Sequence, residues 1–97
     1  MSLPAGTVSF LLTDIEGSTQ KWQLAPDEMA VAVARHYEIL DLAISAHGGV
    51  RPEEQGEGDS IVAAFSRASD ALSAALDAQR ALQREPWPAS TPIAVRM

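Results

Sequence analysis

The chain has 97 residues, of which 46% are hydrophobic and 21% charged, and its formal net charge is −6. A chain of this length can bury one modest core, so the sequence predicts one domain or part of one. Its seven lysine and arginine residues are scattered, which argues against a nucleic-acid-binding surface. The absence of cysteine excludes disulfides and thiolate metal sites. With neither a signal-peptide pattern nor an apolar run long enough to cross a bilayer, the sequence predicts a cytoplasmic protein with no membrane or nucleic-acid partner.

The first half of the chain predicts a strand and then a long helix. Residues 7–13 are rich in β-branched and aromatic side chains, which is typical of a buried strand covered on both faces. Residues 27–46 carry one apolar stripe with helical spacing, formed by Met29, Val33, Tyr37, Leu40 and Ile44. Pro26 marks the start of this helix and the glycine pair 48–49 marks its end.

The second half predicts a hairpin, a helix and a last strand. Residues 50–55 form a short strand that Pro52 confines to the sheet edge, and a glycine-rich turn leads to a buried strand at 60–65. Ser66 is expected to cap a helix that runs to residue 85, and residues 93–97 begin another strand. The apolar side of that helix is predicted to comprise Leu72, Ala75, Leu76, Gln79 and Leu82.

This order of elements, β-α-β-β-α-β, predicts an α+β fold with a ferredoxin-like core. If the strands at 7–13 and 60–65 are antiparallel neighbours, the end of the first lies beside the start of the second. Asp14 and Asp59 should then share one edge of the sheet, and Gln55 at the end of the parallel strand reaches the same edge.

Two converging carboxylates favour Mg²⁺ or Mn²⁺, which take oxygen ligands and also bind phosphate. Three residues after Asp14, Gly17 permits an unusual backbone conformation, and Ser18 or Thr19 can cap a short helix. Outward-pointing amides at such a helix start bind phosphate, so this part of the sequence points to a nucleotide. The glutamates at 53, 54 and 57 are interpreted as a solvated acidic hairpin. His36 and His47 lack a second His or Cys at ligand spacing and are assigned to a helix surface or helix end.

Two segments carry a resemblance to a known family. LLTDIEGST at residues 11–19 and GEGDS at 56–60 are similar to the two metal-binding segments of class III adenylate/guanylate cyclases, and the similarity extends to the closing VRM. The chain looks most like actinobacterial members, and residues 1–97 correspond to the N-terminal portion of the catalytic domain. The resemblance implies that Asp14, the Ile15 carbonyl and Asp59 hold two Mg²⁺ or Mn²⁺ ions. It also implies that the amides of Glu16, Gly17, Ser18 and Thr19 contact the phosphates of ATP or GTP.

The resemblance further implies conversion of the nucleoside triphosphate to a 3′,5′-cyclic nucleotide and pyrophosphate, with the site shared between two subunits. Gln55 stands where the family has a base-contacting Lys, which leaves the choice between ATP and GTP open. The family's ribose-orienting Asn and transition-state Arg come after Met97, so the isolated chain is expected to be inactive. A degenerate cyclase-like module that binds nucleotide or dimerises to regulate an attached domain is the alternative. An unrelated ferredoxin-like binding domain would lack both motifs.

Both faces of the predicted sheet are apolar, whereas the predicted helices cover one. Val8, Phe10 and Leu12 alternate with Leu11 in the first strand, and residues 61–65 are apolar throughout. We therefore expect a homodimer, or other self-association through the uncovered face, or cover from the missing C-terminal region.

Overall fold

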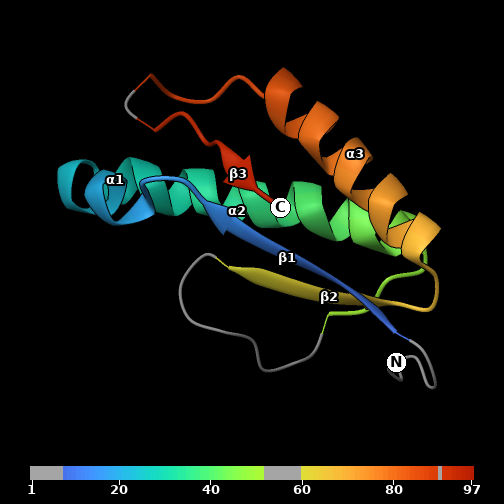
Figure 1. Ribbon diagram of the computed structural model, residues 1–97. Coiled ribbons are helices and arrows are strands. Elements are labelled where there is room, and N and C mark those ends of the chain that lie inside the picture. Colours follow the sequence, from blue (N-terminus) through green and yellow to red (C-terminus); the bar gives the residue numbers. More distant parts are fainter. Residues whose placement is uncertain (1–7, 52–59, 90) are drawn as a thin grey trace.

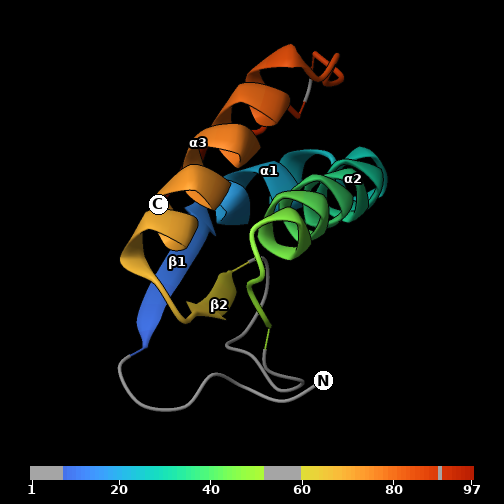
Figure 2. The same ribbon diagram turned by 90° about the vertical axis from the view of Figure 1, so that its right-hand side faces the viewer.

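The computed structural model describes residues 8–51, 60–89 and 91–97. Their elements, in chain order, are β1 (Ser9–Ile15), α1 (Ser18–Leu24), α2 (Pro26–Ala46), β2 (Ile61–Phe65), α3 (Ala68–Arg84) and β3 (Val95–Arg96). The helices lie on one side of the sheet (Figures 1 and 2). None of the helices in the described part of the chain is both long and apolar enough to cross a membrane.

The sheet has the strand order β2-β1-β3, and both neighbours run antiparallel to the central β1. Ser9 pairs with Phe65 at one end and Asp14 pairs with Arg96 at the other. Val50 and Ala64 exchange two backbone hydrogen bonds of 2.9 and 2.8 Å, which places Val50 beside β2 on the side away from β1. The predicted ferredoxin-like α+β arrangement is confirmed. The remainder of the predicted 50–55 strand lies outside the described residues after Arg51.

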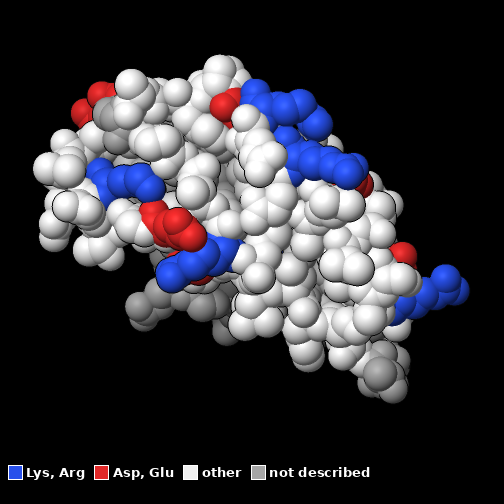
Figure 3. Space-filling view, turned by 45° about the horizontal axis from the view of Figure 1, so that its top comes forward, with Lys and Arg blue, Asp and Glu red and all other residues white. Residues whose placement is uncertain are grey.

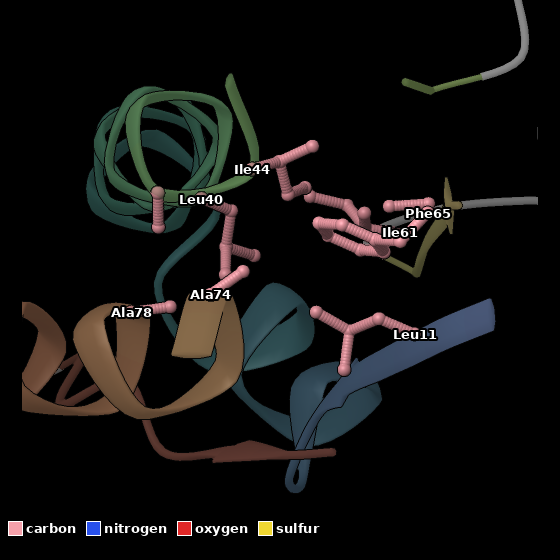
Figure 4. Close-up of a cluster of buried hydrophobic side chains, with 9 residues drawn as sticks. Leu11, Leu40, Ile44, Ile61, Phe65, Ala74 and Ala78 are labelled. Atoms are coloured by element: carbon pink, nitrogen blue, oxygen red, sulfur yellow. The ribbon is translucent and has the colours of Figure 1, made fainter. Parts of the chain in front are cut away.

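One core cluster lies between β1, β2, α2 and α3. Figure 4 shows its side chains pointing toward one another from all four elements. The cluster comprises Leu11, Leu40, Ala43, Ile44, Ile61, Ala63, Phe65, Ala74 and Ala78. The predicted stripe of α2 is confirmed, because Met29, Val33, Leu40 and Ile44 are buried and Tyr37 packs against the core. His47 ends α2 as expected, and its Nε2 lies 2.6 Å from Asp77 Oδ2 on α3.

A second cluster lies where β1 and β3 meet the helices. Ile15 and Val95 belong to it, together with residues from α2, α3 and the segment after α3: Met29, Ala32, Val33, Ile39, Leu82 and Ile93. Trp87 packs against this cluster and donates from Nε1 to the Leu82 carbonyl at 2.9 Å. This cluster fixes the end of the sheet at which Asp14 lies.

The predicted apolar side of α3 is wrong in part. Leu72 and Leu76 are exposed, whereas Ala74, Ala78 and Leu82 form the buried stripe. The alanines lie on the side of α3 that packs against α2 and β1, and the two leucines lie on its outer side. The predicted Ser66 cap is also wrong: the N-cap is Arg67 in an extended conformation, with no side-chain capping hydrogen bond.

His36 is fully buried on α2, which contradicts its predicted place on a helix surface. Its ring lies 5.1 Å from that of Tyr37, centroid to centroid. His36 was assigned to the surface because it lacks a second His or Cys at ligand spacing, and a buried imidazole within a helix has no sequence signal of its own. His36 therefore belongs to the packing of α2.

Gln79 anchors the last strand. Its Nε2 donates to the carbonyl oxygen of Val95 at 2.8 Å, from a partly buried position on α3. We expect Gln79→Ala to lower the free energy of unfolding by about 1 kcal/mol, because the bond is lost and a carbonyl near the core is left without this donor. Gln83→Ala removes the same side chain from an exposed position on α3 and should change stability by less than about 0.5 kcal/mol. Equal urea-unfolding midpoints for the two variants would contradict this role.

Candidate functional site

The candidate site lies at the end of β1, on the sheet face away from the helices. Thr13 and Ile15 are buried beneath the helices, so the alternation of a strand directs Leu12 and Asp14 to the opposite, open face. Leu12 is 61% exposed and the Asp14 side chain is 45% exposed. The carboxylate is thus fixed on a central strand and remains accessible to a ligand.

Asp14 lines a surface hollow of about 390 Å³, which we call the strand-end hollow. It is lined by Leu12, Thr13, Asp14, Ser60, Ile61, Val62, Arg96 and Met97. Ser60 directly precedes β2 and directly follows Asp59 in the sequence. As predicted, the end of the first strand lies beside the beginning of the 60–65 strand, and Asp14 and Ser60 line the same hollow. Asp59 and Gln55 themselves lie outside the described residues.

The turn after β1 contains a glycine in the left-handed conformation, three residues after Asp14. Gly17 has φ 64° and ψ 25° and is itself the N-cap of α1, so the predicted use of glycine is confirmed. The predicted cap by Ser18 or Thr19 is wrong, because the helix already begins at Ser18 and has no side-chain cap. An L-residue at position 17 would be strained by this backbone conformation.

The four predicted phosphate-binding amides fall into two groups: that of Glu16 has a backbone partner, and those of residues 17–19 lie at the start of α1. The Glu16 amide donates to the Ala94 carbonyl at 2.8 Å, and this bond extends the β1–β3 pairing. The amides at 17–19 stand in the first turn of α1, where no helical carbonyl precedes them. Lys21 folds back over this turn, and its Nζ donates to the Glu16 carbonyl at 2.7 Å. Sequence reasoning did not single out this lysine.

Arg96 is a second residue that sequence reasoning missed. Its Nη2 donates to Asp14 Oδ2 at 2.5 Å, across the β1–β3 pair. The closing VRM segment carried only part of the signal, because a strand that buries Val95 directs Arg96 to the other face, whereas its pairing with Asp14 depends on the strand register. In the described part of the chain, no three His, Cys, Asp or Glu side chains gather as a metal cluster.

Charged side chains are otherwise dispersed. On the face shown in Figure 3, basic and acidic groups lie next to one another in small patches, with uncharged surface between them. Ion pairs in the described part of the chain include Arg35 with Glu85 and Arg96 with Asp14. The strand-end hollow thus combines one accessible carboxylate with one neighbouring cation, rather than belonging to an extended basic surface.

The described residues form an α+β domain with an acidic strand end that is followed by a glycine turn. No family model matches the chain. An uncharacterised protein of Mycobacterium tuberculosis is 54% identical over 77 residues, which cover 79% of this chain and 27% of that protein. An adenylate cyclase of Lachancea kluyveri is 36% identical over 85 residues, covering 88% of this chain and 4% of the relative. An adenylate cyclase structure from Trypanosoma brucei, described as monomeric, superposes with a TM-score of 0.74 at 32% identity, covering 82% of this chain and 34% of that one.

Over most of its length the chain is similar to proteins and structures described as adenylate cyclases, in agreement with the resemblance in its sequence. It spans about a quarter of the length of the mycobacterial relative and a much smaller share of the fungal one.

Proposed function

We propose that this chain forms part of a nucleotide cyclase catalytic domain whose strand-end hollow binds divalent cations and a nucleoside triphosphate. The observation that carries the proposal is the position of Asp14, an accessible carboxylate on the open face at the end of the central strand. The similarity of the chain to proteins described as adenylate cyclases supports the same assignment.

The residues present fit Mg²⁺ or Mn²⁺ in chemical type. Asp14 offers a carboxylate and Ile15 a backbone carbonyl, and hard divalent cations prefer such oxygen ligands. Asp59, which precedes β2 in sequence, would supply the second carboxylate, and water and phosphate oxygens would complete the coordination. When bound, the two cations would activate the ribose 3′-hydroxyl and neutralise charge on the triphosphate.

The turn after Asp14 would hold the phosphates. Amides of Gly17, Ser18 and Thr19 at the start of α1 are the donors that we assign to this role. The Glu16 amide can join them only if its bond to the Ala94 carbonyl opens. Gln55 would contact the purine and so influence the choice between ATP and GTP.

The reaction that we propose for a complete domain is attack of the ribose 3′-oxygen on the α-phosphorus, which forms the 3′,5′-cyclic nucleotide and releases pyrophosphate. The 97-residue chain alone should bind nucleotide without cyclising it, because groups that stabilise the developing charge are needed in addition to ground-state binding. Gln55 in place of the family's Lys favours a second candidate, a degenerate module that binds nucleotide and regulates an attached domain.

Self-association would occur through the open face of the sheet. Phe10 and Leu12 are each 61% exposed there, and Phe10 shares a surface hollow with Leu72 and Met97. Apolar side chains gathered in this way are typical of a surface that another chain or another segment covers. We therefore propose a homodimer that buries this face.

The test is nucleotide binding and turnover by the purified 97-residue chain. We expect Mn²⁺-dependent binding of ATP that Asp14→Asn weakens about tenfold, and no cyclic nucleotide above the uncatalysed background. Asp27→Asn, an identical change at an exposed position on α2, should leave binding unchanged. Equal ATP affinity in the wild-type and Asp14→Asn chains would contradict the site. Cyclic nucleotide formation that Asp14→Ala abolishes would contradict the predicted inactivity.

Base selectivity provides a separate prediction. In a complete domain that contains this chain, Gln55→Lys should shift the ratio of kcat/KM for ATP to that for GTP by about tenfold, because the amide can donate and accept whereas an ammonium only donates. The measurement compares both substrates at matched Mn²⁺ concentration. A folded, active variant with an unchanged ratio would show that Gln55 does not read the base.

A further inference from the structure

The contact between Asp14 and Arg96 is the most specific polar contact in the strand-end hollow. The two residues stand directly opposite each other in the β1–β3 register, and their side chains share the open face because Ile15 and Val95 are buried on the other. A hydrogen bond of 2.5 Å joins Arg96 Nη2 to Asp14 Oδ2. The carboxylate assigned to the cation is therefore already in contact with a guanidinium.

The backbone that carries Arg96 is held from three sides. The Ala94 carbonyl accepts the Glu16 amide, the Val95 carbonyl accepts Gln79 Nε2 at 2.8 Å, and the Val95 side chain packs in the second core cluster. Asp14 is equally fixed within β1. The pair is thus set by the register of two strands, which favours it over a chance meeting of two surface side chains.

A cation at Asp14 must share the carboxylate with this guanidinium or displace it. Either course opposes cation binding, because sharing brings two positive charges close together and displacement breaks a charge-assisted hydrogen bond. We propose that Arg96 is a positioning residue that holds the Asp14 carboxylate in the cation-free site, competes for it, and thereby sets the cation affinity. This inference rests on the proposed function of the hollow.

A purely structural role makes a different prediction. The side chains of Arg96 and Asp14 are 65% and 45% exposed, and ion pairs at such positions contribute little to folding stability. Removal of the guanidinium should therefore change cation affinity much more clearly than the unfolding midpoint. Salt should weaken the competition, because the pair faces solvent.

The experiment measures Mn²⁺ binding by electron paramagnetic resonance of the free ion, using the 97-residue chain at low ionic strength. We expect Arg96→Gln to lower the Mn²⁺ dissociation constant roughly threefold to tenfold, with a smaller effect in 0.5 M salt. Arg96→Lys keeps the charge, so its Mn²⁺ dissociation constant should lie between those of Arg96→Gln and the wild type. Arg67→Gln is the matched control, since it removes the same charge beyond β2 at the opposite end of the sheet, and it should change affinity less than twofold.

The outcomes separate the inference from the proposed function. Unchanged or weaker Mn²⁺ binding in Arg96→Gln, together with a loss of binding in Asp14→Asn, overturns the inference and leaves the cation site standing. Equal increases in Mn²⁺ affinity in Arg96→Gln and Arg67→Gln also overturn the inference, because the change in net charge would then explain the effect. Mn²⁺ binding that is absent from every chain, or insensitive to Asp14→Asn, overturns both.

A second measurement follows Arg96 directly. In the metal-free chain the Arg96 side-chain Nε–Hε signal should have a shift characteristic of a paired guanidinium, and titration with diamagnetic Mg²⁺ should move it while the Arg67 signal stays in place. Saturation of the Asp14 backbone shift without any movement of the Arg96 signal would overturn the competition.

Discussion

Asp14→Asn in a complete domain that contains this chain should lower kcat for cyclic nucleotide formation roughly 10²- to 10³-fold, with the fold retained. The substitution keeps the size of the side chain and removes the charge that would hold the cations, so electrostatic stabilisation of the transition state is lost. Steady-state assays over a range of Mn²⁺ concentrations measure the effect, and circular dichroism checks the fold.

Asp27→Asn is again the matched control, because Asp27 is an exposed carboxylate in the first turn of α2 and should leave kcat within about twofold. If the Asp14→Asn enzyme keeps more than about a tenth of the wild-type rate, with the same Mn²⁺ dependence, Asp14 is not part of the catalytic site.

Phe65→Ala should have the largest effect on stability, a loss of about 3–5 kcal/mol in the free energy of unfolding. Phe65 is fully buried between the sheet and α2, and a Cβ added at Gly49 would lie 2.5 Å from its ring, so the ring fills its space tightly. Domains of this size are stable by roughly 5–15 kcal/mol, so this one change removes a large share.

The second phenylalanine of the chain provides the comparison. Phe10 is 61% exposed, and Phe10→Ala should change the stability of the monomer by less than about 1 kcal/mol. Urea unfolding at low protein concentration measures both variants without interference from association. A loss below about 1 kcal/mol for Phe65→Ala would show that the core can collapse around the missing ring.

Strong periodic patterns predicted the elements well, and neighbour geometry explains the errors. The stripe of α2 and the strand β2 follow from apolar spacing alone. In α3 the same reasoning favoured Leu72 and Leu76 over Ala74 and Ala78, because leucine is more hydrophobic. In the structure the alanine side of α3 is the side that packs against α2 and β1, and such tertiary packing is not encoded in any local window of the sequence.

The candidate site was predictable only in part for a similar reason. Asp14 and Gly17 belong to one continuous segment whose turn chemistry can be read locally: Asp14 lies near the end of β1, and Gly17 adopts the left-handed conformation that the sequence predicted. Arg96 reaches Asp14 only through the pairing of strands 82 positions apart, and Gln79 holds that strand from a helix. Such contacts depend on strand register, which the spacing of residues 93–97 did not specify.

The central position of β1 has a consequence for the order of folding. Both partners of this first strand come from the later part of the chain, and its pairing with β3 must close a loop from Asp14 to Arg96. Local contacts can form α2 and α3 early, whereas the sheet has to wait for distant segments to meet, which is slow because loop closure costs entropy. During synthesis on a ribosome, the Asp14 end of the sheet therefore acquires its shape last, after almost the whole of this segment has emerged.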